Sequence, residues 1–198
     1  MIMERGIPTN LRSLEPYSVV RLPSLDLTKS KEPSSTCIIR ASTCSTILNT
    51  PGYYTPLPPM NPANIVFTKT TPDKGVGLFA KHGAKIHQVI FWERPLLVFP
   101  RGLPVFDLEG LSKEEMTEKT DLNFEKTLQQ ALNIMTKEEV DAYMGLSNCL
   151  AKSPQLYGIA RTNSFGASDI EEENFEEGKL GYAAVGRLVS RINHSYVI

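Results

Sequence analysis

The sequence predicts an α+β fold, and three observations along the chain lead to this class. Residues 64 to 99 are rich in β-branched and aromatic residues, which is typical of strands. Residues 111 to about 150 instead carry capping boxes and apolar residues at helical spacing. Nine of the 14 prolines lie within the first 62 residues, and Ser and Thr fill 15 of the first 60 positions. We therefore expect a disordered or low-order leader at 1–62 and an ordered domain at 63–198.

The composition of the chain excludes several classes of protein. The formal net charge of -1 over 198 residues gives no global case for direct nucleic-acid binding. The sequence contains no run of 18 apolar residues, so we expect no membrane span. The cysteines and histidines are too scattered for a disulfide framework or a metal site, so no metal ligand is predicted. These residues are Cys37, Cys44, Cys149, His82, His87 and His194.

The leader also allows a second interpretation, a mitochondrial transit peptide. Its first 60 residues hold six basic and four acidic residues. Transit peptides are poor in acids and form Arg-rich amphipathic helices. Glu4 and Glu15 lie early in the chain, and no such helix is evident. These observations favour the disordered leader.

The β-rich part begins with a predicted hairpin. The segment "NIVFTKT" predicts a strand, "TPDKG" predicts a tight turn, and "VGLFAK" predicts the returning strand. The stretch "HQVIFWERPLLVF" is too continuously apolar for a strand with one exposed face, so we expect burial on both faces. Pro95 is expected to end or bend this stretch.

The helical part is expected at about 108–150. Ser112 with Glu115, and Thr136 with Glu139, fit the capping-box pattern that opens a helix. After these helices, "GIARTNSFGAS" predicts extended or turn-rich structure. The acidic segment "DIEEENFEE" predicts a solvated loop, and a patch that attracts a basic peptide is the alternative.

Two short motifs are candidates for binding. The letters from Gly75 to Ala80 fit the dinucleotide fingerprint, but a Pro-Asp turn precedes them and a β-rich run follows, so we reject that site. A Gly-x-Gly in a hairpin can still offer bare backbone groups to a ligand, or can be a plain hairpin. The pair Asn193–His194 ends an apolar segment and is either a binding pair or a solvated surface pair.

Taken together, four segments in this order resemble the SET-domain protein lysine methyltransferases. They are "DKGVGLFAK", "VIFWERPLLV", "RTNSFG" and "SRINHS", and they span about residues 64 to 195. The likeness is greatest to fungal-type members with a long helical insert. It implies short, curled β-sheets, a bound S-adenosylmethionine, and a lysine-bearing protein substrate, with histones among the candidates.

The resemblance also implies roles for single residues. Lys74, Gly75, Val76 and Gly77 would line the cofactor, mainly through backbone groups. Asn163 would be a further cofactor contact. Asn193 would hold the methionyl part of the cofactor, and His194 would meet its adenine. The family more often has a glycine at the position of His87.

The chain departs from the family after Ser195. Tyr196 replaces the family's cysteine, and the later segment that carries the catalytic tyrosine is not found, so no catalytic residue is assigned. We therefore expect a SET-like domain that is incomplete at its C-terminus and catalytically inactive as this chain. The alternatives are a non-catalytic SET-derived module that binds a cofactor or a peptide, and a fragment without independent function. The sequence leaves the localisation, nucleus or cytosol, undetermined.

Overall fold

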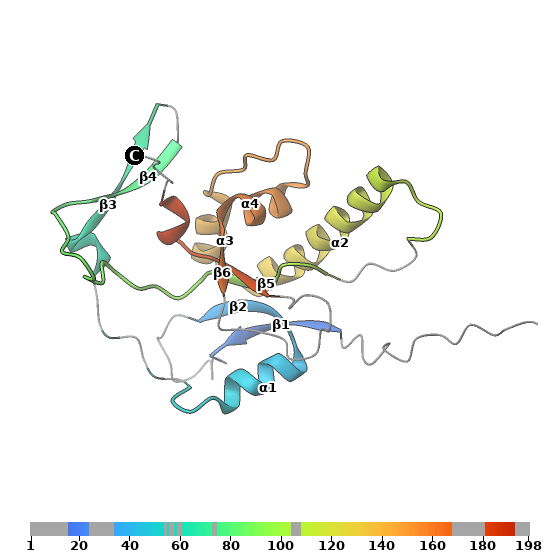
Figure 1. Cartoon of the computed structure of the whole chain (residues 1–198), viewed down its shortest axis with the longest axis horizontal. Helices are drawn as coiled ribbons and strands as arrows, with labels where there is room; N and C mark the ends of the chain where they lie inside the picture. The colour runs from blue at the N-terminus through green and yellow to red at the C-terminus, as the bar shows by residue number, and fades with distance from the viewer. Residues whose placement is uncertain are drawn as a thin grey trace, which may run out of the picture.

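The computed structural model confirms the α+β class. It describes residues 16–23, 34–53, 55, 58, 61–72, 75–103, 108–167 and 181–192. Within these residues the chain forms a five-stranded sheet, a two-stranded sheet, four α-helices and two short 3-10 helices (Figure 1). No helix in this part of the chain is both long enough and apolar enough to cross a membrane.

The larger sheet is mixed and has the strand order β1-β2-β5-β7-β6. Strands β2 and β5 are parallel, and the other three neighbouring pairs are antiparallel. Segments far apart in the sequence therefore lie side by side in one sheet. The strands are β1 (Tyr17–Leu22), β2 (Ser35–Arg40), β5 (Leu97–Pro100), β6 (Ser164–Ala167) and β7 (Tyr182–Val185).

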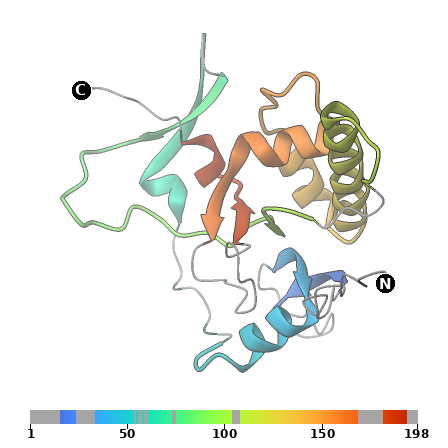
Figure 2. The same cartoon turned by 45° about the vertical axis from the view of Figure 1, so that its right-hand side comes forward.

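Helices cover both faces of this sheet. Helix α1 (Ala41–Asn49) packs on one face, and α2 (Lys113–Asn133), α3 (Lys137–Met144) and α4 (Gln155–Asn163) lie on the other (Figures 1 and 2). Because successive side chains of a strand point to opposite faces, one strand contributes side chains to the hydrophobic cores on both faces of the sheet. In β2, Ile39 joins the core beneath α1 and Ile38 joins the core beneath α2. The central strands are consequently buried on both faces.

The structure corrects the expectation of low order at 1–62. Strands β1 and β2 and helix α1 all lie within that range. The guanidinium of Arg21 in β1 contacts both carboxylate oxygens of Glu139 in α3, each at 2.7 Å, and donates to the carbonyl of Ile134 at 3.0 Å. The high Pro, Ser and Thr content of this range obscured two short β-prone runs in the sequence, "YSVVRL" and "STCIIR". The first pairs with the second, the second pairs with β5, and helices pack on both.

Both predicted capping boxes are confirmed. The Ser112 hydroxyl accepts the Glu115 N–H at 3.2 Å, and the Glu115 carboxylate accepts the Ser112 N–H at 2.8 Å. Hydrogen bonds from the backbone and the side chain of Ser112 hold the pKa of the Glu115 carboxyl below its usual value. Thr136 and Glu139 exchange the same bonds at 3.3 and 2.8 Å. The first turns of α2 and α3 are therefore fixed by local sequence.

The segment "GIARTN" is helical, which corrects the prediction of extended structure. It forms the end of α4, which begins after Pro154 without a side-chain cap of its own. The carboxylate of Glu125 in α2 accepts the N–H groups of Leu156 and Tyr157 at 3.1 and 2.8 Å. The cap comes from a residue about thirty positions away, so no local pattern announces this helix.

The apolar stretch at residues 87–99 forms a shorter strand than predicted. Only Leu97–Pro100 is extended in the sheet, after Pro95, and all four of its residues are buried as expected. The earlier part of the stretch corrects that expectation, because Val89 is 59% exposed. The residues from 84 to 95 run as irregular chain.

The predicted hairpin is confirmed, with β3 (Val66–Thr71) and β4 (Gly75–Ala80) paired antiparallel. The 3-10 helices are η1 (Pro62–Asn64) and η2 (Val189–Arg191).

Candidate functional site

Strand β4 brings the Gly-x-Gly segment beside the loop that follows α3. Gly75 has φ +65°, a conformation that L side chains rarely adopt, so glycine is needed at this end of the hairpin. The hydroxyl of Thr71 donates to the Gly75 carbonyl at 3.0 Å and closes the turn. A Cβ added at Gly75 would lie 3.7 Å from the Ser147 hydroxyl oxygen. The first glycine therefore faces the α3–α4 loop.

Asn163 ends α4 and fastens the same loop. Its side chain is buried, and its amide nitrogen donates to the carbonyls of Ser147 at 2.6 Å and Ile159 at 2.7 Å. An amide offers two N–H bonds and one carbonyl oxygen. Both N–H bonds are directed to protein carbonyls, so the oxygen is the part of the amide left for a ligand.

Ser190, in η2, ties the segment before Asn193 to the end of α4. Its hydroxyl donates to the Asn163 carbonyl at 2.8 Å and accepts the Gly186 N–H at 3.0 Å. The guanidinium of Arg191 donates to the Gly145 carbonyl at 3.3 Å. Helix η2 is thus joined both to α4 and to the end of α3.

Glu93 holds the turn that leads into η2. Its carboxylate accepts the Leu188 N–H at 3.0 Å and the Val189 N–H at 2.7 Å. Glu93 was not among the site residues predicted from the sequence. The signal that could have identified it is its place in "ERPLLV", one of the segments that carry the family resemblance.

These contacts assemble four segments that are distant in the sequence, and we name their meeting place the motif junction. It comprises Gly75–Gly77 of β4, Ser147, Asn163 and Val189–Arg191 of η2. Figure 2 shows η2, in dark red, between the β3–β4 hairpin and α4. Of the predicted set, Gly75 and Asn163 both approach Ser147, and Val76 and Gly77 follow Gly75 in β4. Lys74, Asn193 and His194 lie outside the described residues.

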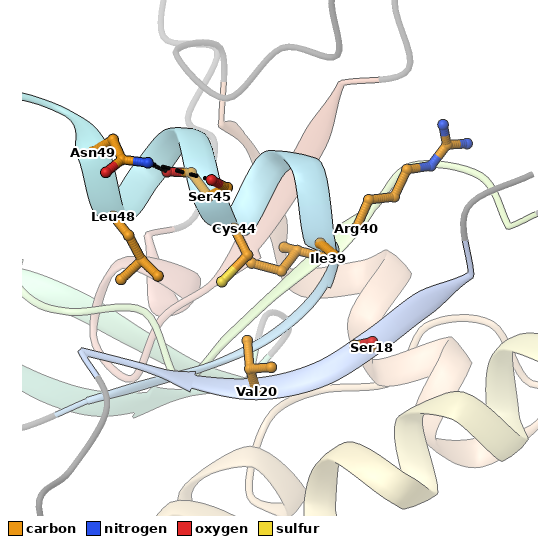
Figure 3. Close-up of a pocket in the computed structure, with 9 residues that line it drawn as sticks. Ser18, Val20, Ile39, Arg40, Cys44, Ser45, Leu48 and Asn49 are labelled. Carbon is orange, nitrogen blue, oxygen red and sulfur yellow. Dashed lines mark hydrogen bonds between the residues drawn. The ribbon is translucent and has the colours of Figure 1, made fainter. Parts of the chain in front are cut away.

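A pocket elsewhere in the molecule is unrelated to the predicted site. It has a volume of about 360 Å³ and lies between α1 and the strands β1 and β2 (Figure 3). None of the predicted cofactor contacts lines it. The lining residues are Ser18, Val20, Ile39, Arg40, Ala41, Cys44, Ser45, Leu48 and Asn49.

Two ionisable groups of the core are held in their neutral forms. Burial, reinforced by the nearby Cys44, raises the pKa of the Cys37 thiol to about 12. Burial and the negative charge of Glu125 raise the pKa of Tyr143 well above its usual value, and its hydroxyl donates to the Leu156 carbonyl at 2.7 Å. Neither group ionises near neutral pH, so both act as structural residues of the core.

Comparisons of the chain with protein-family models, with curated proteins and with solved structures found no match.

Proposed function

We propose that the chain binds S-adenosylmethionine at the motif junction, as a domain of the SET protein lysine methyltransferase kind. The observation that carries this proposal is the convergence of the segments on which the resemblance rests. Gly75 and Asn163 each approach Ser147, and Ser190 bonds to Asn163. Segments that merely shared letters with a family by chance would have no reason to meet at one place.

The chemistry of the junction fits the cofactor. Strand β4 belongs to a two-stranded sheet, and no other strand in the described part of the chain pairs with it. The edge of β4 away from β3 therefore presents backbone N–H and C=O groups that can hydrogen-bond a ligand. The glycines of "GVG" carry no Cβ that would keep a ligand away from these groups. The oxygen of the Asn163 amide adds one side-chain acceptor.

The backbone at His87 supports the same proposal. His87 has φ 65° and is the one non-glycine residue with positive φ in the described part of the chain. This conformation is costly for a residue with a Cβ and is natural for glycine. The family more often has glycine at this position, and a glycine-like backbone at His87 therefore supports the proposal.

The reaction class that goes with this site is methylation of a lysine side chain in a protein, with histones among the candidates. S-adenosylmethionine supplies a methyl group on a sulfonium, which a neutral amine can accept. The part of the chain in this step is to orient the cofactor, because alignment of donor and acceptor is a main source of rate. Backbone groups of β4 and the rigid Asn163–Ser190 contact would provide that orientation.

Isothermal titration of S-adenosylmethionine into the full chain tests the proposal. We expect saturable binding by the wild type, and weaker binding by Asn193→Ala, because the resemblance gives Asn193 the methionyl part of the cofactor. Asn133→Ala is the matched control, since Asn133 is exposed at the end of α2. The absence of binding by the wild type would refute the proposal, and equal binding by both variants would remove Asn193 from the site.

A second measurement separates an enzyme from a binding module. Transfer of a radiolabelled methyl group to histones, followed by identification of methyl-lysine, would establish the reaction. Because this chain is expected to be catalytically inactive, saturable cofactor binding without transfer is the expected result, and robust transfer would overturn that expectation.

A further inference from the structure

We infer that Glu93 is a positioning residue, which sets the affinity for the cofactor by holding residues 186–190 in place. The inference rests on the proposed function, because the held segment leads directly into Asn193 and His194. Glu93 lies just before β5, and its partners lie 95 and 96 residues later in the chain. The carboxylate therefore joins two segments that no local interaction could bring together.

The hydrogen bonds of Glu93 use both oxygens of its carboxylate. One oxygen, Oε1, accepts both the Leu188 N–H at 3.0 Å and the Val189 N–H at 2.7 Å, while Oε2 also lies 3.0 Å from the Leu188 nitrogen. Hydrogen bonds to an ionised acceptor are stronger than those between neutral groups. Three contacts on consecutive amides fix both the place and the orientation of this backbone.

Gly186 makes room for this arrangement. A Cβ added at Gly186 would lie 2.3 Å from Glu93 Oε1 and 2.4 Å from a methyl carbon of Val189. No real Cβ approaches its neighbours so closely, so any side chain here would displace the carboxylate or the turn. The glycine thus serves the fit of Glu93 to the backbone that it holds.

The effect of Glu93 reaches the motif junction through Ser190. The turn that Glu93 fixes carries Gly186, whose N–H is accepted by the Ser190 hydroxyl, and that hydroxyl donates to the Asn163 carbonyl. Without the carboxylate, the remaining side-chain hydrogen bonds from residues 186–192 to other described segments are those of Ser190 and Arg191, beside the packing of η2 on β4. We therefore expect residues 186–192 to lose their fixed position while the sheet and helices persist.

Two readouts on the full chain test the inference. In Glu93→Ala, we expect the affinity for S-adenosylmethionine to fall about tenfold or more, and the amide exchange of Leu188 and Val189 to accelerate by a similar factor. Exchange in the buried strand β5 should stay unchanged, which separates positioning from global unfolding. Glu109→Ala is the matched control, because Glu109 is exposed and lies outside the junction.

A conservative variant keeps the test decisive if Glu93→Ala folds poorly. Glu93→Gln retains one oxygen that can accept both N–H groups but loses the charge, so its affinity should lie between those of the wild type and Glu93→Ala. Gly186→Ala should weaken binding in the same direction, by displacing the carboxylate.

The outcomes distinguish this inference from the proposed function. If the wild type binds and Glu93→Ala binds equally well, the positioning role is wrong and the proposed function stands. If the wild type does not bind, the proposed function fails. The exchange data then decide the inference: faster exchange confined to 186–192 supports the holding role of Glu93, and unchanged exchange overturns it.

Discussion

Two phenylalanine pairs show how differently the two sheets of this protein are built. Phe99 of β5 and Phe124 of α2 meet edge to face, with ring centroids 6.4 Å apart, and each is 2% exposed. Phe67 of β3 and Phe79 of β4 stack with centroids 5.7 Å apart, but remain 42% and 37% exposed. The first pair joins a sheet to a helix, and the second joins only the two strands of a hairpin.

The difference indicates that the five-stranded sheet provides most of the stability, whereas the hairpin is the part that can contribute to binding. Burial of apolar surface is the main source of folding free energy, and the five-stranded sheet buries side chains on both faces. The hairpin buries little, so it adds little to stability, but Gly75 and Val76 stay exposed at the motif junction. Functional segments are commonly positioned by a stable scaffold in this way. Three matched pairs of substitutions and one pH dependence test this contrast between the two sheets.

The aromatic pairs themselves give the largest contrast. Phe99→Ala should lower the free energy of unfolding by about 3 to 5 kcal/mol, because it removes a buried ring and leaves a cavity. Phe67→Ala should cost less than about 1 kcal/mol, since nearly half of that side chain is already in water. Urea unfolding of both variants measures the two values. Equal losses of unfolding free energy would show that the hairpin contributes as much to stability as the larger sheet.

The ion pair of Arg21 tests whether the N-terminal strands belong to the stable scaffold. Arg21→Met should cost about 2 kcal/mol, because it leaves the largely buried Glu139 carboxylate without its partner. Lys137→Met is the control, since the Lys137–Asp141 pair is exposed on one helix and should contribute nothing measurable. A loss no larger than that of the control would mean that β1 is only loosely attached to the domain.

The same pair predicts a dependence on pH. Burial raises the pKa of the Glu139 carboxyl, but hydrogen bonds from Arg21 and Thr136 together lower it below its usual value. A carboxyl whose pKa is lowered in the folded state stabilises the fold above the unfolded pKa, about 4.3. This contribution disappears as the pH falls through the lowered folded value. The wild type should therefore lose its advantage over Arg21→Met on acidification, as unfolding curves between pH 7 and 3 would show.

Two glycines of the hairpin region give the smallest and most local effect. Gly75→Ala should cost about 1 kcal/mol, because alanine is strained at φ +65°. Gly83→Ala should be neutral, since Gly83 has ordinary φ and open space around it. Amide exchange should accelerate in β3 and β4 of Gly75→Ala alone. Acceleration that extends into β5 would show that the hairpin and the larger sheet unfold together.

The sequence-based predictions were correct where the interacting residues are neighbours in the sequence, and they failed where the partners are far apart. The capping boxes at Ser112 and Thr136 and the β3–β4 hairpin were correct, because neighbouring residues determine them. Helix α4 was missed because Glu125 of another helix caps it. Strands β1 and β2 were missed because they are six-residue runs in a segment rich in Ser, Thr and Pro, and their partners are each other and the distant β5, which pairs with β2.

For the candidate site, the amino-acid pattern alone was enough to select the candidate segments. The Gly-x-Gly, the "ERPLLV" segment and Asn163 were all singled out without coordinates. The tertiary structure decided what their side chains do. Both N–H bonds of the Asn163 amide are donated to backbone carbonyls. The Glu93 carboxylate accepts the backbone N–H groups of Leu188 and Val189. A motif records which residue types are present, whereas a hydrogen-bond partner ninety residues away exists only after the sheet has brought the two segments together.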